Sequence, residues 1–320
     1  MTTQDLFVSA YITAPTDPAA EDAFYDAVAG LDLGGLEFAL SPAGARTLDP
    51  DWIDAHVPAH WDLVVTLVPT MTVRRADQPA YGLASADDGA RDRALDDVAR
   101  ARDLARALAD RHGRRRVAAI EVHTAPGPLL GTTAAFARSL DELLGWDLAG
   151  AEVLVEHCDA HVPGQAPAKG FFTLDEEIAV VRSFDLPPER LGLSVNWGRS
   201  AIEGRDPATA VDHTRTAAAT GLLRALVLSG ATDADTAWGP AWGDMHIPPR
   251  GDAPALAASA ASLLGPDEIA ATLAAAGDVP RVGLKWAARP ADADVAARLA
   301  IVTATVEQVV AARGALAATR

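Results

Sequence analysis

A lysine is the residue of this chain whose type and position most strongly suggest chemistry. The chain has two lysines, Lys169 and Lys285, against 25 arginines, and a cation that only needed to be charged and solvated would be expected to be arginine. Lys285 follows the apolar run 282–284, where a buried strand would end. Its amine can polarise a substrate carbonyl, or form a Schiff base if its pKa is depressed. Lys169 lies in a long loop, as a candidate substrate-binding residue.

Carboxylates and imidazoles recur at the ends of other apolar runs. The segment AEVLVEHCDAH contains Glu156, Asp159 and His161, and the segment RVAAIEVH contains Glu121 and His123. Glu121 and His123 are two residues apart, so on a strand they share one face. Whether this face points into the interior of a barrel depends on the strand register, which the sequence leaves open. We expect Glu156 and Glu121 to transfer protons and His123 to bind substrate.

Further polar side chains at strand ends are candidates for binding a substrate. They are Glu37 in GLEFAL, Asn196, Trp197 and Arg199 in NWGRS, and Ser229 after LRALVL. Glu37 is explained equally well as an inward carboxylate that pairs with an arginine in the floor of a barrel.

The segment 229–252 is much longer than an ordinary connection and is typical of a binding loop or lid. It carries Trp238, Trp242, Asp244 and His246. A tryptophan face can stack on a sugar ring, Asp244 can bind a hydroxyl, and His246 can move a proton. The alternative is that the tryptophans only attach the loop to the rim of the protein.

These candidates need a scaffold that brings strand ends together. Apolar runs rich in β-branched residues alternate eight times with segments of helical period. The predicted strands cover 6–12, 35–40, 62–69, 116–123, 151–157, 191–196, 223–229 and 281–285. The predicted helices cover 18–29, 50–56, 87–112, 131–145, 173–183, 206–219, 253–275 and 291–314.

Eight strand and helix repeats without a flexible linker predict a single (β/α)8 TIM barrel domain over residues 1–320. The runner-up is an open doubly wound sheet, but the first strand-to-helix turn lacks the glycine pattern of that fold. In a TIM barrel the active site lies at the C-terminal ends of the strands. The candidate residues above fall at those ends.

Composition narrows the class of partner. The net charge of -17 and the pI near 4.7 would repel phosphate backbones and anionic membranes, so we expect neither nucleic acid nor a membrane as a partner. The one cysteine, Cys158, excludes an intramolecular disulfide and a multi-thiolate zinc site. The absence of a signal-peptide pattern and of an 18-residue apolar run predicts a cytoplasmic protein.

The segments GLEFAL, EVLVEHCDA, LGLSVNWGRSAIEGRDP and GPAWGDMHIPP together resemble the xylose-isomerase-like TIM barrels, a superfamily of sugar isomerases, epimerases and endonuclease IV. The whole chain also resembles the bacterial DUF4862 family, and that resemblance implies no activity. The superfamily resemblance implies a sugar-like small-molecule substrate and a homo-oligomer.

The superfamily holds a divalent metal with carboxylates and imidazoles on four strands. The resemblance places Glu156, Asn196, Arg199, Ser229 and Lys285 at those positions. Only Glu156 keeps a ligand type that a hard cation prefers. We therefore expect no metal cofactor, and we expect Lys285 to pair with Glu156 in the place of the metal. The alternative is a metal site rebuilt from Glu156, Asp159, His161 or His246.

Three functions follow from these candidates. The first is a metal-independent sugar isomerase or epimerase, in which Lys285 and Arg199 polarise an oxygen while Glu156, Glu121 or His246 moves a proton. The second is an aldolase or lyase that forms a Schiff base through a Lys285 of depressed pKa. The third is a catalytically inactive barrel that only binds a carbohydrate.

Overall fold

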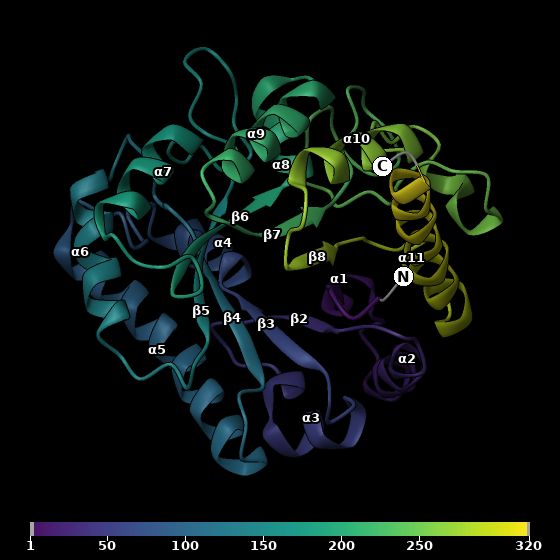
Figure 1. Cartoon of the computed structure of the whole chain (residues 1–320), viewed down its shortest axis with the longest axis horizontal. Coiled ribbons are helices and arrows are strands. Elements are labelled where there is room, and N and C mark those ends of the chain that lie inside the picture. The colour runs from purple at the N-terminus through teal and green to yellow at the C-terminus, as the bar shows by residue number, and fades with distance from the viewer. Residues whose placement is uncertain (1–2, 319–320) are drawn as a thin grey trace.

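The computed structural model describes residues 3–318 and contains a closed barrel of eight parallel strands in chain order. The last strand pairs with the first, with Phe7 opposite Gly283, and this pairing closes the barrel. Helices surround the strands on the outside (Figure 1). The predicted (β/α)8 fold is confirmed.

The strands and helices have the following bounds. The strands are β1 (Leu6–Val8), β2 (Gly35–Ala39), β3 (Asp62–Thr66), β4 (Val117–Val122), β5 (Glu152–His157), β6 (Leu191–Asn196), β7 (Leu223–Leu228) and β8 (Arg281–Leu284). The helices are α1 (Ala10–Thr13), α2 (Pro18–Ala29), α3 (Pro50–His56), α4 (Val68–Asp77), α5 (Asp88–His112), α6 (Thr133–Leu144), α7 (Leu174–Ser183), α8 (Trp197–Gly204), α9 (Pro207–Ala219), α10 (Pro266–Ala276) and α11 (Val295–Ala318).

Two predicted strands are too long, because short helices begin where β-branched residues continue. Strand β1 ends at Val8, and α1 follows at once. Strand β3 ends at Thr66, and α4 begins at Val68 with Pro69 in its first turn, a position that proline favours. These helices turn the chain away from the barrel at its mouth.

Helix α8 is absent from the sequence prediction, and the predicted helix 253–275 is shorter in the structure. The Asn196 side chain accepts a hydrogen bond from the Arg199 amide and so caps α8, a signal that the sequence contains. The segment 253–275 contains a 3-10 turn at Pro254–Ser259, and α10 begins only at Pro266. Helix α7 begins with a reciprocal capping box between Thr173 and Glu176.

The barrel interior is stacked in layers along its axis. A buried ion pair between Glu152 and Arg281 lies at the N-terminal end of the strands, with Nη2 2.6 Å from Oε1. Above it lies an apolar layer formed by Phe7, Val64, Ala119, Leu154 and Ala225. Side chains alternate along a strand, so the next inward residues after Ala119 and Leu154 are Glu121 and Glu156. The open register question is thereby settled for Glu121, which faces the interior. His123 lies just beyond the end of β4 and borders a small cavity that Tyr81 and Val98 also line.

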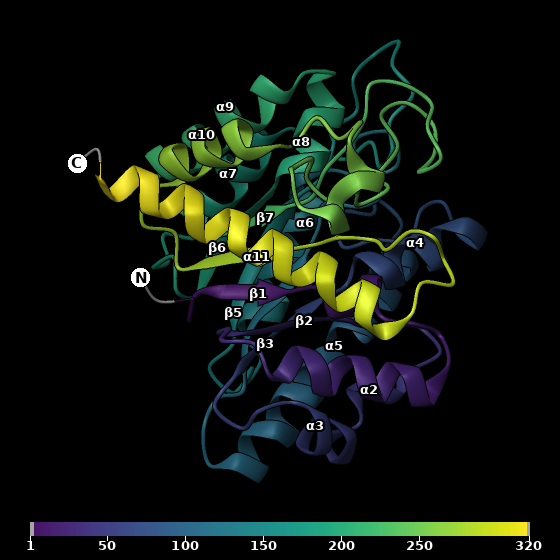
Figure 2. The ribbon, with the colours of Figure 1, turned by 90° about the vertical axis from the view of Figure 1, so that its right-hand side faces the viewer.

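Helix α11 is long and apolar enough by composition to span a membrane, a feature that the sequence reading missed. In the structure it is the outer helix of the last repeat and packs beside α2 and α10 (Figure 2). Its residues Ile301, Val302 and Thr305 are buried against the barrel. A buried inner side explains the apolar composition.

Candidate active site

The lysine that the sequence singled out lies at the mouth of the barrel and pairs with the second strand. Lys285 is buried, and its Nζ lies 2.8 Å from Glu37 Oε1. Burial alone would lower the pKa of Lys285, but Glu37, Tyr11 and Glu156 together outweigh burial, and the pKa is raised well above its usual range. The expected direct pair with Glu156 is wrong, and so is the position of Glu37 in the barrel floor. The depressed pKa that the Schiff-base reading requires is also not found.

Glu156 pairs instead with the guanidinium of the first turn of α8. Arg199 Nη1 lies 2.5 Å from Glu156 Oε1, and the Asn196 amide donates to the same oxygen at 3.2 Å. Burial would raise the pKa of Glu156, but Arg199 and then Lys285 outweigh burial, so the pKa is lowered. The other carboxylate oxygen, Oε2, is buried and makes no hydrogen bond. It is therefore free to accept a proton or a hydroxyl.

Two long loops meet over this cluster through Asp244. Its carboxylate lies 3.2 Å from both Lys169 Nζ and Arg199 Nε. His246 Nδ1 lies 2.8 Å from Ser229 Oγ and 3.5 Å from Asp244 Oδ1. Burial lowers the pKa of His246 to about 3, against the attraction of Asp244, so this imidazole is neutral at pH 7.

The backbone of the strand-seven loop is in an uncommon conformation at two candidate residues. Trp242 and His246 have φ angles of 59° and 52°, in the left-handed region. The loop is held there by backbone hydrogen bonds, including Trp242 N to Thr232 O at 2.7 Å and Ala287 N to His246 O at 2.7 Å. Such conformations persist where surrounding structure enforces them, often at functional sites.

Glu121 and His123 are buried on the interior face of β4 and just beyond it. Burial, followed by the charges of Glu156 and Glu37, raises the pKa of Glu121 well above its usual range. Burial lowers the pKa of His123 to about 4. Glu121 Oε2 and both ring nitrogens of His123 lack hydrogen-bond partners. Buried polar atoms without partners are costly in a completed core, and the Glu121 carboxylate shares the barrel interior with Glu156.

The tryptophan candidates do not join this cluster. Trp197 is fully buried in the hydrophobic core beside the barrel wall. Trp238 is also buried and donates its indole N–H to Ala258 O at 2.8 Å, which supports the alternative that it attaches the loop to the rim. Trp242 is half-buried, with the Arg205 guanidinium 5.5 Å from its ring centre.

The residues of the alternative metal site are not brought together either. The Asp159 carboxylate accepts backbone N–H groups of Ala168, Lys169 and Gly170 and so shapes the strand-five loop. Among residues 3–318, the group of His and acidic residues close enough to share an ion is a different one: His157, Glu203 and His213.

Sequence reasoning did not select the two residues that complete the Lys285 and Glu37 pair. The Ser9 hydroxyl donates to Glu37 Oε2, and the Tyr11 hydroxyl lies 3.5 Å from Glu37 Oε1. Lys285 Nζ also lies over the Tyr11 ring, 5.7 Å from its centre. Ser9 alternates with the inward residue Phe7, and this spacing was the available signal.

The closed barrel, with ionisable residues gathered at the C-terminal ends of its strands, defines a (β/α)8 protein with its candidate site at the usual end of that fold. A xylose isomerase domain-containing protein of Salmonella typhimurium has the same fold, with a TM-score of 0.57 and 10% identity over 97% of this chain and 98% of that one. D-psicose 3-epimerase has it too, with a TM-score of 0.53 and 13% identity over 97% and 96% of the two chains. At these identities the likeness shows the fold.

The chain belongs to DUF4862, a domain family of unknown function whose profile matches residues 7–301. An uncharacterised protein of Salmonella typhimurium is 36% identical over 209 residues, which are 63% of this chain and 63% of that protein. The match therefore spans less than two thirds of that relative. The predicted membership of the DUF4862 family is confirmed, and the solved structures confirm that the chain has the fold of the xylose-isomerase-like barrels.

Proposed function

We propose that this protein is an isomerase or epimerase of a sugar or sugar-derived molecule, and that it transfers a proton between Glu156 and Glu121 without a divalent metal. The observation that carries the proposal is that the pKa values of two buried carboxylates are shifted in opposite directions. The pKa of Glu156 is lowered and that of Glu121 is raised, although both lie in one interior cluster. Carboxylates whose pKa values are driven apart are typical of an acid and base pair.

The free oxygens of the two carboxylates support this division of roles. Glu156 Oε2, ionised and without a hydrogen bond, would take the proton from the carbon next to the substrate carbonyl. Glu121, protonated, would return a proton to the substrate from its own unpartnered oxygen. The exchange conserves protons and electrons, as an isomerisation requires. Charge that develops on the substrate oxygen would be stabilised by N–H groups of Lys285 and Arg199.

The cations around Glu156 support chemistry without a metal. A divalent ion in the superfamily position would need anionic or neutral ligands. Arg199 directly contacts Glu156, and Lys285 adds a second positive charge that lowers its pKa. This donor set does not fit a divalent cation, and we route no step through one.

The surrounding charges favour an uncharged substrate. Lys285 contacts Glu37, Lys169 contacts Asp244, and Arg199 contacts both Asp244 and Glu156. A phosphate or carboxylate group would have to compete with these partners. We therefore expect a neutral polyhydroxy carbonyl compound, a class to which the sugar named for one structural neighbour, D-psicose 3-epimerase, belongs.

Deuterium exchange tests the proposed function. The full-length protein, treated with chelator, would be incubated in D2O with a panel of free ketoses and aldoses and with their phosphates. We expect deuterium at the carbon next to the carbonyl, detected by NMR, with a free sugar and not with its phosphate. The variants Glu156→Gln and Glu121→Gln should lose exchange by at least about 100-fold, the usual size of a general acid or base contribution.

The variant Glu121→Gln serves as its own structural control, because glutamine is as neutral as the protonated carboxyl it replaces. Its thermal unfolding should match that of the wild-type protein. The proposal is wrong if exchange occurs only after a divalent metal is added and Glu156→Gln no longer binds that metal. It is also wrong if saturable sugar binding is found with no exchange, which would leave the binding-only function.

A further inference from the structure

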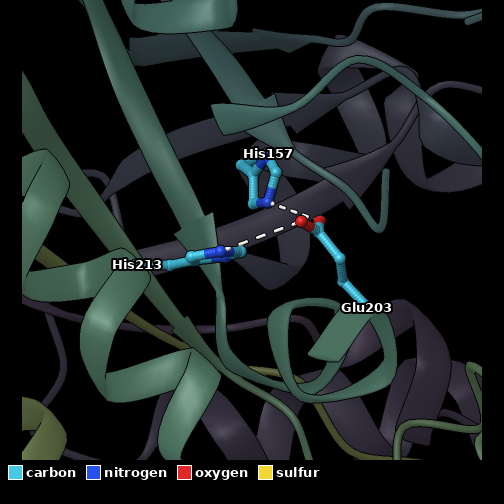
Figure 3. Close-up of side chains that lie close together, drawn as sticks. All are labelled: His157, Glu203 and His213. Atoms are coloured by element: carbon cyan, nitrogen blue, oxygen red, sulfur yellow. Dashed lines mark ion pairs between the residues drawn. The ribbon is translucent and has the colours of Figure 1, made fainter. Parts of the chain in front are cut away.

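A second cluster of ionisable side chains lies outside the barrel interior, on the opposite face of β5. His157 follows Glu156 in β5 and points away from the interior toward α8 and α9 (Figure 3). Glu203 comes from α8 and His213 from α9. His213 is half-buried and not solvated as expected for a helical histidine, because α9 turns it toward His157, with ring centres 4.9 Å apart.

We infer that His157, Glu203 and His213 form a zinc-binding site. Glu203 Oε2 lies 3.1 Å from His157 Nε2, and Glu203 Oε1 lies 3.8 Å from His213 Nε2. One ligand atom from each residue lies within 4.8 Å of the other two. Tetrahedral zinc with bonds of about 2.0–2.1 Å holds its ligand atoms about 3.4 Å apart, so small movements would close the site. Two imidazoles and one carboxylate are a known zinc set that leaves a fourth position for water.

A carboxylate behind His157 supports the inference. His157 Nδ1 lies 2.8 Å from Glu177 Oε2, and Glu177 Oε1 accepts a hydrogen bond from the Thr124 hydroxyl at 2.7 Å. A histidine that binds a metal through one nitrogen usually donates the other N–H to such a carboxylate. The Glu177 contact therefore fixes the ring with Nε2 directed at Glu203.

Two nitrogens of this cluster lack a hydrogen-bond partner among residues 3–318. His157 Nε2 is fully buried and makes no well-formed hydrogen bond despite its short contact with Glu203. His213 Nδ1 is buried and also has no partner. If protein contacts alone completed this cluster, we would expect one of them to provide a hydrogen bond to His157 Nε2.

Charge balance gives a reason for a dication. The carboxylates of Glu177 and Glu203 lie 2.8 Å and 3.1 Å from the two ring nitrogens of the buried His157, so two acidic groups converge on one imidazole. Zinc would replace the Nε2 proton of His157 and neutralise both carboxylates. Glu203 and His213 retain partial exposure, at 13% and 18% of their side chains, so an ion can enter from solvent.

The zinc would act on the candidate active site as a positioning device. The same helix α8 carries Arg199 and, one turn later, Glu203, while the same strand β5 carries Glu156 and His157. A metal that joins His157 to Glu203 would therefore fix α8 against β5 and hold Arg199 on Glu156. This inference does not depend on the proposed reaction.

Metal titration tests the site. The full chain, purified without a metal-affinity tag and stripped with chelator, would be titrated with ZnCl2 by calorimetry, and with CoCl2 followed by visible absorption. We expect one equivalent of zinc, a tetrahedral cobalt spectrum, and a rise in Tm of a few degrees at saturating zinc. The variant His213→Ala should bind at least about tenfold more weakly.

His56→Ala is the matched control, because His56 is equally exposed and also pairs with aspartates. It should bind zinc like the wild-type protein. The inference is overturned if the wild-type protein binds no zinc, or if His213→Ala binds as tightly as wild type. Loss of zinc in His246→Ala with retention in His213→Ala would move the ion into the barrel and overturn it as well. None of these readouts depends on turnover.

Discussion

Lys285 and Glu37 form a buried ion pair across the seam of the barrel, with β1 between the two strands that carry them. The pair is surrounded by Ser9 and Tyr11, which also contact the carboxylate. Removing one member of a buried pair leaves the other charge without a partner, and this is more costly than removing both. The pair therefore has consequences for stability as well as for chemistry.

We predict that Lys285→Met destabilises the protein by about 3–5 kcal/mol, because it leaves the buried Glu37 carboxylate without its cationic partner. The double variant Lys285→Met with Glu37→Gln should recover much of that stability but none of the activity. Urea unfolding of the four proteins in this double-mutant cycle measures the effect. A single variant as stable as wild type would show that the pair is not formed in solution.

The two tryptophans of the strand-seven loop should behave differently on truncation. Trp238→Ala should cost about 3–5 kcal/mol, because its buried ring and its hydrogen bond to Ala258 are lost. Trp242→Ala should change stability by less than about 1 kcal/mol but raise KM for a sugar, since its half-exposed ring offers a stacking face. Denaturant unfolding and steady-state kinetics separate the two roles. Equal effects on KM would contradict this assignment.

The pattern of the sequence was sufficient to predict the barrel but not its contacts. Apolar β-branched runs mark the eight strands, because each strand is buried on both faces. The short helices α1, α4 and α8 were not predicted from the sequence, because each follows a strand closely and begins with residues, such as Val68 and Trp197, that are as apolar as those of a strand. For α8 the Asn196 cap was an available local signal, whereas packing at the barrel mouth decides the conformation of α1 and α4, which have no side-chain cap.

The site residues were largely recognised from their places at strand ends, whereas their pairing was not. Which carboxylate contacts Lys285 depends on how β8 pairs with β1 and on the stagger between strands. Neither can be predicted from the local spacing of residues. His213 lies in the predicted helix 206–219, where nothing in the sequence marks it as a site residue. The rotation of α9 that turns it onto His157 becomes visible only when the helices are packed.

Replacing His123 should make the free energy of unfolding less sensitive to acid. Its native pKa is about 4 against an ordinary value of 6.5, so the unfolded chain binds this proton first as the pH falls between those values. His123 therefore lowers stability progressively from pH 6.5 to pH 4. We predict that His123→Phe, which preserves the stacking on Phe171, gains stability over wild type as the pH falls and raises KM for substrate. Unfolding at pH 5 and pH 8 measures the first effect. Free energies of unfolding that change by the same amount with pH in the two proteins would contradict this prediction.

His157 should show the opposite pH dependence, and zinc should remove it. Burial lowers its pKa, but Glu177 and Glu203 outweigh burial and raise it to about 10 from an ordinary value of 6.5. The stability contributed by this imidazolium is fully present below pH 6.5 and is lost as the pH rises toward 10, because the unfolded chain has already released the proton. We predict that metal-free protein loses up to about 1.4 kcal/mol per pH unit in that window.

Zinc bound to Nε2 would keep His157 neutral at every pH in the window, so the zinc-loaded protein should lose less stability between pH 7 and pH 9.5 than the metal-free protein. Urea unfolding at these two pH values, with and without zinc, measures the difference. His157→Gln, which carries no titrating proton, should show the shallow dependence under both conditions. A steep loss that persists in saturating zinc would mean that the proton, and not the metal, occupies the space between His157 and Glu203.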